Sequence, residues 1–218
     1  MRMRMKKNLE TRMEKCESVL LDTPVFDKDS RLPVTGEQYI DLPAVFGRKA
    51  PLRMDIGCGK GQFTRELAKQ NPDIDIISVE IVRNVIVAAC EKVVRDELTN
   101  VRFMCLSAEY LPRFIPEHSV ELIYLNFSCP YKNCKLTAPR FLECYRRMLT
   151  ENGEIHLKTD NMGFFEYSIE QLSQAGYKLK NISLDLHNSG FEGNIVTEYE
   201  KKFSDLGQPI YRLEASVQ

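Results

Sequence analysis

The sequence predicts an α/β fold built around a mostly parallel sheet, because two patterns and one turn occur together. From residue 51 onward, short apolar runs typical of buried strands alternate with segments whose apolar positions recur at helical spacing. A glycine-rich turn stands where the first apolar run passes into the first helical segment. This alternation is typical of right-handed βαβ units, whose parallel strands are covered by helices on both faces.

The order of the elements follows from the same patterns. Five apolar runs predict strands at residues 52–56, 74–80, 101–106, 120–127 and 154–159. Four segments with helical periodicity predict helices at residues 61–70, 82–93, 140–149 and 164–175. The tail carries two more strand-like runs, at 182–186 and 210–215, without an amphipathic segment of helix length of its own. We expect these two runs to pair as an antiparallel hairpin at a sheet edge.

Length and composition are those of an ordinary globular chain. With 218 residues, of which 43% are hydrophobic and 28% charged, one or two domains are expected. We divide the chain into a lead-in, 1–50, and a single domain, 51–218, on which the lead-in packs. The first 15 residues form a basic arm with six basic and two acidic side chains, although the net charge of the whole chain is only -1.

The apolar runs and the cysteines of the sequence indicate where the protein acts and the state of its thiols. No run approaches the roughly 20 apolar residues of a membrane span, and the first residues lack the apolar core of a signal peptide. We therefore expect a cytoplasmic protein. The seven cysteines are an odd number without the spacing of a disulfide framework, which predicts reduced thiols.

The glycine-rich turn predicts a nucleotide-like ligand. Gly57, Gly59 and Gly61 alternate with single residues directly after the first strand, and glycines there permit positive φ and close approach of the backbone to a ligand. A dinucleotide fingerprint would place its third glycine at position 62, where this chain has Gln62. The spacing therefore favours S-adenosylmethionine (SAM) over NAD. A glycine-bearing turn that binds nothing is the alternative.

Residues at the ends of the predicted strands extend this site. Asp55, two residues before the first glycine, is suited to the ammonium group of the ligand. Glu80 ends the second strand 19 residues after Gly61, where a carboxylate can accept hydrogen bonds from both ribose hydroxyls. Ser107 and Ala108 follow the third strand and could address an adenine edge, although a plain surface loop explains them equally well.

Polar residues also follow the fourth strand, at the edge where open α/β sheets place their chemistry. Asn126 is followed by Cys129, Pro130 and Tyr131. This pattern suits a transferase that acts on a planar amine or base, on which an aromatic ring can stack. An ordinary loop with a packed tyrosine is the alternative.

Several segments resemble the bacterial tRNA (guanine-N7)-methyltransferase family, and the resemblance extends over nearly the whole chain. The segments are the MRMR start, DIGCGKGQF at 55–63, AKQNP at 68–72, YLNFS at 124–128, HLKTDN at 156–161 and SLDLHNSGFEGNIVTEYEKKFSDLGQPIYR at 183–212. The long tail segment is more diagnostic than a glycine loop. The resemblance implies a SAM-dependent methyltransferase (Rossmann-like) fold of seven strands, with the last strand antiparallel, and an enzyme that methylates N7 of a guanine in tRNA.

The resemblance also implies roles for individual residues. The cofactor would be held by Asp55, Gly57, Gly59, Gly61, Glu80, Ser107, Ala108 and Asn126. The target nucleotide and its phosphates would meet Lys132, Asp160, Thr197, Glu198, Tyr199, Glu200 and the basic arm. On the residues alone, Asp160 could instead cap the helix that follows it, and residues 197–200 could form a polar edge strand.

The chain departs from the family pattern after the fourth strand. Cys129 replaces the Asp of the usual DPWPKKRHxKRR string, Tyr131 replaces its Trp, most of its basic residues are missing, and Ser107 replaces an acid after the third strand. Guanine N7 has a lone pair and no proton, so its methylation needs positioning and no general base. We predict that Cys129 and Asp160 are the catalytic residues.

Other hypotheses compete with this one. Cys129 could act as a nucleophile, as in methylation of a base carbon, whereas zinc on Cys129, Cys134 and Cys144 would lack a neighbouring His, so no metal is expected. The alternative function is a divergent paralogue that binds SAM, with or without RNA, and has weak, lost or altered methylation activity. An NAD-dependent enzyme is a third hypothesis. We expect tRNA as the partner, no membrane partner, and a monomer or homodimer.

Overall fold

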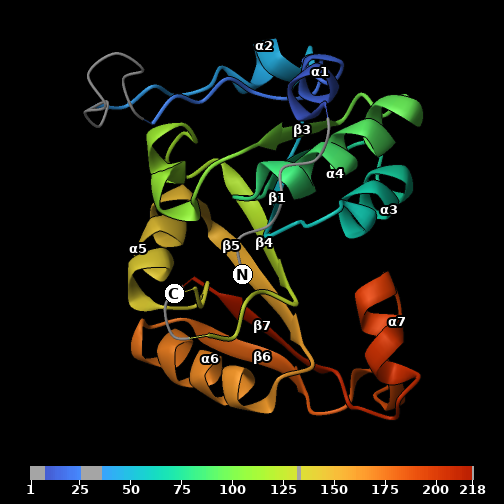
Figure 1. Ribbon diagram of the computed structural model, residues 1–218. Coiled ribbons are helices and arrows are strands. Elements are labelled where there is room, and N and C mark those ends of the chain that lie inside the picture. The colour runs from blue at the N-terminus through green and yellow to red at the C-terminus, as the bar shows by residue number, and fades with distance from the viewer. Residues whose placement is uncertain (1–7, 26–35, 132–133, 218) are drawn as a thin grey trace.

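A seven-stranded sheet forms the centre of the protein (Figure 1). The computed structural model describes residues 8–25, 36–131 and 134–217. The strands lie side by side in the order β3-β2-β1-β4-β5-β7-β6. Their bounds are β1 Leu52–Ile56, β2 Asp75–Val79, β3 Val101–Met104, β4 Val120–Asn126, β5 Leu149–Thr159, β6 Lys178–Ser183 and β7 Tyr211–Ser216.

The direction of the strands confirms the predicted fold class. Neighbouring strands are parallel except at β7, which runs antiparallel to both β5 and β6. The chain builds β2 and β3 on one side of β1, and then crosses to build β4 and β5 on the other side. At such a switch point the loops at the carboxyl ends of the strands turn in opposite directions and leave a crevice for a ligand.

The tail differs from the prediction in three ways. β6 spans Lys178–Ser183 and so begins before the predicted run. Ile182 and Leu184 of that run are exposed, and Leu186 is buried in a 3-10 segment, η2 (Leu186–Asn188), that follows the strand. β7 pairs with β6 as expected, but it lies inside the sheet, between β5 and β6. A short helix, α7 (Glu198–Ser204), also separates the two strands. The possible polar edge strand at residues 197–200 was therefore wrong.

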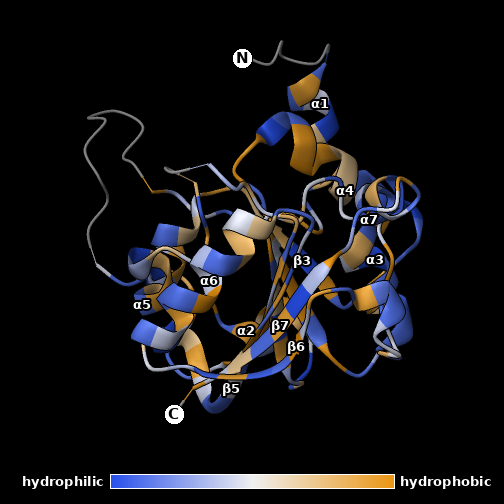
Figure 2. Ribbon diagram, turned by 90° about the horizontal axis from the view of Figure 1, so that it is seen from below, coloured by the Kyte–Doolittle hydropathy of each residue, from blue (hydrophilic) through white to orange (hydrophobic). Residues whose placement is uncertain are grey.

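Helices cover both faces of the sheet (Figure 1). On one face lie α3 (Gln62–Gln70) and α4 (Arg83–Arg95), and on the other lie the 3-10 segment η1 (Ala108–Arg113), α5 (Pro139–Met148) and α6 (Met162–Gln174). Alternate residues of one strand point to opposite faces, so Ile76 packs in the core under α3 and α4, and Ile77 packs in the core under α5. Hydrophobic and hydrophilic stretches alternate along both the strands and the helices (Figure 2).

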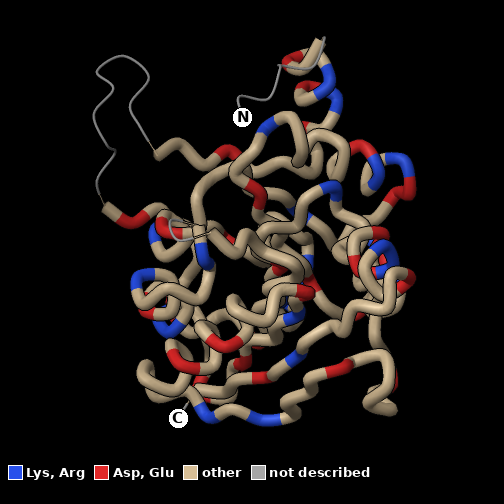
Figure 3. The backbone as a smooth tube through the Cα atoms, turned by 60° about the horizontal axis from the view of Figure 1, so that its bottom comes forward, with Lys and Arg blue, Asp and Glu red and all other residues tan. Residues whose placement is uncertain are grey.

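The described part of the lead-in packs against this domain. Helix α1 (Leu9–Glu14) contacts α4, and Leu9, Met13 and Cys16 are buried in the same core as α3 and α4. Helix α2 (Leu42–Phe46) precedes β1. Charges of both signs are interspersed along the described chain (Figure 3). Within residues 8–25, 36–131 and 134–217, no helix combines the length and the apolar character that a bilayer crossing needs.

Candidate functional site

Two cavities adjoin where the carboxyl ends of β1, β2 and β4 meet. The first, of about 430 Å³, lies between the glycine loop, the end of β4 and the start of α7, and we call it the α7 cavity. The second, of about 550 Å³, lies between the glycine loop, the loop after β3 and the loop after β4, and we call it the strand-end cavity. Gly57, Gly59 and Phe127 line both cavities, so together these form one site.

The three glycines of the loop have different roles. Gly57 and Gly59 line both cavities with positive φ angles of 82° and 57°, and a Cβ on Gly59 would meet nothing within 4 Å. A ligand can therefore approach this backbone closely. Gly61 lines neither cavity, and a Cβ there would stand only 2.5 Å from the Cβ of Ala89. Gly61 thus serves the close packing of α3 on α4.

Asp55 is a buried acid in the wall of the α7 cavity. Its side chain is almost inaccessible and accepts a hydrogen bond of 2.6 Å from the hydroxyl of Thr64. Burial raises the pKa of Asp55 to about 7, although the Thr64 hydrogen bond and the positive charge of Lys158 oppose the shift. A cation in the cavity would favour the ionised form of Asp55, so this acid is suited to an ammonium group.

Glu80 stands directly after β2 and ties the glycine loop to the sheet. Its carboxylate accepts hydrogen bonds from the backbone N–H of Gly59 at 3.2 Å and of Val82 at 2.9 Å. Each carboxylate oxygen has a second lone pair, and Glu80 lines the strand-end cavity. The geometry therefore fits a carboxylate that holds its own loop and also accepts hydrogen bonds from a diol.

The loops after β3 and β4 form the opposite wall of the strand-end cavity. Ser107 and Ala108, predicted as cofactor-binding residues, both line it. Ser128, which was not predicted, lines it as well, and its buried hydroxyl has no hydrogen-bond partner within the described chain. A buried hydroxyl without a partner inside a cavity is suited to hydrogen bonding with a ligand. Ser128 belongs to the segment YLNFS, so the sequence contained a signal for it.

The end of β4 enters the α7 cavity with Asn126 and Phe127. The buried Asn126 Nδ2 has no hydrogen-bond partner among the described residues. Phe127 has a positive φ of 51°, which a bulky residue rarely adopts. Its ring lies 5.1 Å from the ring of Tyr199, measured between centroids. Unusual backbone at this strand end thus brings an aromatic ring beside α7, at the mouth of the site.

Cys129 and Cys134 form a disulfide, so the prediction of reduced thiols was wrong for this pair. Their Cα atoms are 5.7 Å apart, and both residues line the strand-end cavity. The chain folds back after β4 and brings together two sulfurs that the sequence spacing alone did not pair. While the disulfide persists, Cys129 has no thiol to act as a nucleophile or as a zinc ligand. Lys132, the predicted phosphate contact, lies outside the described residues.

Asp160 follows β5 and lies near α7. It does not cap the next helix as the alternative assumed, because Asn161 is the N-cap of α6 and accepts a hydrogen bond of 2.8 Å from the N–H of Phe164. Burial, with the negative charge of Asp160 second, raises the pKa of the Tyr199 hydroxyl, which places the acid close to that ring. Asp160 itself lines neither the α7 cavity nor the strand-end cavity.

The predicted segment from Thr197 to Glu200 forms the cap and the first turn of α7, and not all of it lines the cavity. Thr197 caps the helix, and its hydroxyl accepts a hydrogen bond of 3.0 Å from the N–H of Glu200. The side chain of Gln62 accepts a hydrogen bond from the N–H of Glu198, which joins α7 to the glycine loop. Thr197, Glu198 and Tyr199 line the α7 cavity. A Thr followed three residues later by a Glu is a capping-box pattern, which could have predicted this helix.

Glu200 lies outside the cavity, in a buried ion pair. Its carboxylate is fully buried and lies 2.8 Å from Lys158 Nζ, 2.7 Å from Asn194 Nδ2 and 3.1 Å from His187 Nε2. Burial lowers the pKa of Lys158, and the charge of Glu200 opposes this shift. In this arrangement Glu200 fixes α7 to β5, and it does not line the wall of the α7 cavity.

Comparison with known proteins places the chain in a family. A family model described as a putative methyltransferase matches residues 49–213. The chain belongs to this methyltransferase family. Curated members named tRNA (guanine-N(7)-)-methyltransferase include one from Geobacillus sp. (strain WCH70), 48% identical over 78% of this chain and 80% of its own length, and one from Bacillus subtilis (strain 168), 47% identical over 78% and 82%. One from Streptococcus pneumoniae (strain CGSP14) is 44% identical over 78% and 83%.

Solved structures of methyltransferases share the fold at low sequence identity. The 16S rRNA methyltransferase KamB superposes with a TM-score of 0.63 at 14% identity, covering 84% of this chain and 95% of that one. A SAM-dependent methyltransferase from Aquifex aeolicus gives a TM-score of 0.57 at 15% identity, covering 98% and 100%. At this identity the likeness establishes the methyltransferase fold of the family.

Proposed function

We propose that this protein transfers a methyl group from SAM to N7 of a guanine in tRNA. The observation that carries the proposal is the α7 cavity, where the glycine loop, the end of β4 and the start of α7 meet in one wall. The names of the relatives, at 44 to 48% identity, supply the substrate and favour the active enzyme over a divergent paralogue.

The residues of the two cavities fit SAM. Asp55 would bind its ammonium group, and Glu80 its ribose hydroxyls. Ser107, Ala108 and the unpartnered hydroxyl of Ser128 would surround its adenine. When bound, the cofactor supplies a methyl group on a sulfonium, which needs no activation by a metal. Gly57 and Gly59 leave the backbone open on this side, whereas we assign Gly61 to packing.

The α7 cavity suits a guanine base. The rings of Phe127 and Tyr199 provide a surface on which a base can stack. Asp160 and Glu198 would accept hydrogen bonds from the N–H groups of guanine, and the free Asn126 Nδ2 would donate either to guanine O6 or to the cofactor carboxylate. Since N7 has no proton to lose, these residues contribute by holding N7 in line with the methyl group.

The proposed function also bears on the predicted roles of Cys129, Lys132 and the basic arm. The predicted catalytic role of Cys129 requires a thiol and therefore a reduced pair, but N7 methylation does not require a thiol. We propose that Lys132 and the basic arm contact phosphates of tRNA, and that the protein acts in the cytoplasm as a monomer or homodimer. Its net charge of -1 makes such local contacts necessary, because the whole chain does not attract RNA.

The proposal is tested by methylation of an unmodified tRNA transcript with purified protein and SAM, followed by nucleoside mass spectrometry. We expect 7-methylguanosine. Asp160→Asn should lower kcat/KM by about tenfold or more, since it removes a charged acceptor, whereas the matched control Asp205→Asn, an exposed residue at the other end of α7, should not. If neither this transcript nor tRNA from a strain lacking the gene acquires 7-methylguanosine, the proposal is wrong.

A further inference from the structure

A third cavity lies on the α3 side of the sheet and has no role in the site described above. It measures about 470 Å³, and we call it the sheet cavity. Its walls come from α3, from β1, β4, β5 and β7, and from residues 191–195 of the loop before α7. It shares Phe63 and Asn126 with the α7 cavity. The two cavities therefore adjoin at these two side chains.

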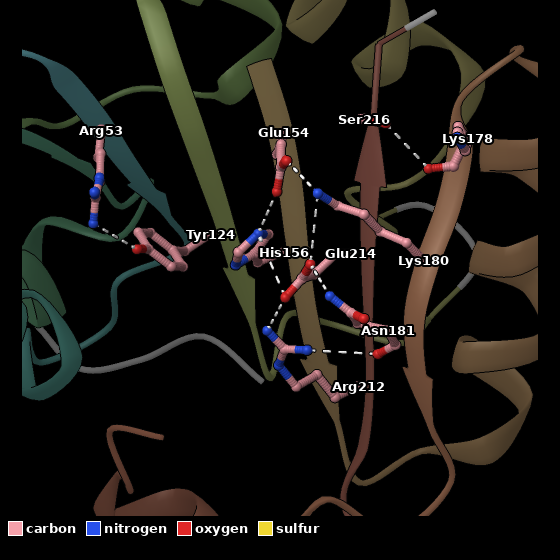
Figure 4. A network of polar contacts seen from close by, with 10 residues as sticks. All are labelled: Arg53, Tyr124, Glu154, His156, Lys178, Lys180, Asn181, Arg212, Glu214 and Ser216. Atoms are coloured by element: carbon pink, nitrogen blue, oxygen red, sulfur yellow. Dashed lines mark hydrogen bonds and ion pairs between the residues drawn. The ribbon is translucent and has the colours of Figure 1, made fainter. Parts of the chain in front are cut away.

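Most charged groups beside this cavity are already paired (Figure 4). Arg212 bonds to Glu214, Lys180 bonds to Glu154, and Lys158 pairs with Glu200. Glu154, His156 and Glu214 lie close enough together to suggest a metal site, but Lys180 and Arg212 already neutralise these two carboxylates. The cluster therefore has no charge left with which to attract a cation.

Arg53 is the exception among these cations. It projects from β1 toward Tyr124 (Figure 4), and its guanidinium donates one hydrogen bond, of 3.3 Å, to the hydroxyl of Tyr124. It has no carboxylate partner in the described chain, and its buried Nε has no hydrogen-bond partner there. An arginine donor that is buried without an acceptor is costly, and a planar guanidinium fits the oxygens of a phosphate.

Aromatic rings surround this free donor. Phe63 packs edge-on against Tyr124, with ring centroids 4.8 Å apart, and Tyr124 packs edge-on against His156 at 5.8 Å. Phe191 lies on the far side, under the guanidinium of Arg212 at 3.8 Å. Burial lowers the pKa of His156, so its ring is largely uncharged near neutral pH. Aromatic surfaces beside a cation are the features with which proteins bind single-stranded nucleotides.

We propose that the sheet cavity binds a nucleotide adjacent to the target guanosine, with its phosphodiester at Arg53 and its base among Phe63, Tyr124 and Phe191. This rests on the proposed function, because the α7 cavity must hold the target base for the neighbour to reach the sheet cavity. The strand of RNA would then run from α7 across the face of β4, β5 and β7.

The test compares Arg53→Gln with the wild type, with Arg53→Lys, and with Arg95→Gln as a control that removes an exposed charge at the end of α4. For Arg53→Gln we expect KM for tRNA to rise about tenfold with kcat retained, and the slope of log KM against log salt to fall by about 0.7, the value for one lost phosphate contact. Arg53→Lys keeps the charge and should keep the slope. Arg95→Gln should match the wild type.

Two further measurements keep the outcomes distinct. For Arg53→Gln, binding of S-adenosylhomocysteine should equal that of the wild type and the melting temperature should not fall, which would show that the fold and the cofactor site are intact. If the wild type methylates tRNA but Arg53→Gln keeps its KM and salt slope, the inference fails and the proposed function stands. If instead free GMP binds in an Arg53-dependent manner while KM for tRNA is unchanged, the cavity takes a free nucleotide and the inference about RNA is overturned.

Discussion

The two halves of the sheet differ in how deeply their ion pairs are buried. Around β1, β2 and β3 each of the long-range ion pairs has at least one partly exposed partner, whereas around β4, β5 and β7 both partners of the pair between Lys158 and Glu200 are buried. In the first half, the Glu80 carboxylate accepts hydrogen bonds from two backbone N–H groups, those of Val82, two residues away, and of Gly59, 21 residues away. In the second half, Lys158 reaches Glu200, 42 residues away, and Glu154 reaches Lys180, 26 residues away.

Because of this difference, the two halves should respond differently to salt and to the loss of a single charged side chain. Apolar packing and hydrogen bonds to backbone N–H groups change little with salt, so the proposed cofactor half should depend little on ionic strength. A buried ion pair is stable only while both partners are present, because a single buried charge is strongly unfavourable. The proposed substrate half, including α7, should therefore fail first when one partner is removed.

The largest effect is expected from breaking the pair that fixes α7. Lys158→Met leaves the buried Glu200 carboxylate with only Asn194 and His187 as partners in the described chain, and we expect a loss of about 3 to 5 kcal/mol in the free energy of unfolding. The control Lys201→Met, in an exposed pair with Asp205, should cost less than about 0.5 kcal/mol. Urea unfolding monitored by circular dichroism measures both.

A double variant sharpens this prediction. Lys158→Met together with Glu200→Met removes both charges and should recover much of the lost stability, because two apolar side chains can fill the space of a buried pair. Equal losses in Lys158→Met and Lys201→Met would show that the second half does not depend on this pair.

The next effect concerns pH and the cofactor half. The pKa of Asp55 is about 7 in the folded protein, above its value in an unfolded chain. Its contribution to stability is therefore fully present in acid and is lost as pH rises through 7. Relative to the wild type, Asp55→Asn should gain roughly 2 to 3 kcal/mol between pH 5 and pH 8. Unfolding in urea at both pH values measures this, and parallel behaviour of the two proteins would argue against a raised pKa.

The same comparison explains which predictions from the sequence were successful. The fold class, the strand at 52–56 and the placement of Asp55, Gly57 and Glu80 at the cavities depend on local patterns, and each is present in the structure. The buried pair of Lys158 and Glu200 depends on a contact across 42 residues, for which one sequence carries no signal.

Other errors have separate physical causes. The strand predicted at 182–186 was placed by its apolar residues, but pairing with β7 decides where β6 lies. Ile182 and Leu184 remain exposed, and Leu186 is buried outside the strand, in η2. The polar residues 197–200 were compatible with an edge strand, but they begin a helix, because the Thr197 hydroxyl accepts a hydrogen bond from the N–H of Glu200. The disulfide required a turn that brings two Cα atoms to 5.7 Å, which spacing along the chain does not establish.

A smaller effect should separate the glycines within the cofactor half. Gly61→Ala places a Cβ against Ala89 at positive φ, so we expect a loss of about 1 to 3 kcal/mol with little effect on SAM affinity of the folded protein. Gly59→Ala meets open space and should cost about 1 kcal/mol from its φ alone, while SAM affinity falls. Thermal unfolding and calorimetric titration measure the two quantities, and the reverse pattern would contradict the assignment of Gly61 to packing.

The smallest effect is expected at the loop where the two halves meet, from the disulfide between Cys129 and Cys134. Because this bond closes a short loop, its reduction should lower the free energy of unfolding by no more than about 2 kcal/mol. Thiol titration of the denatured, unreduced protein should find the five free cysteines, and titration after reduction should find all seven. Cys134→Ser should melt like the reduced wild type and should no longer respond to reductant, whereas the exchange Cys144→Ser leaves the pair intact and should keep that response. Seven titratable thiols before reduction would show that the loop after β4 does not need the bond to line the strand-end cavity.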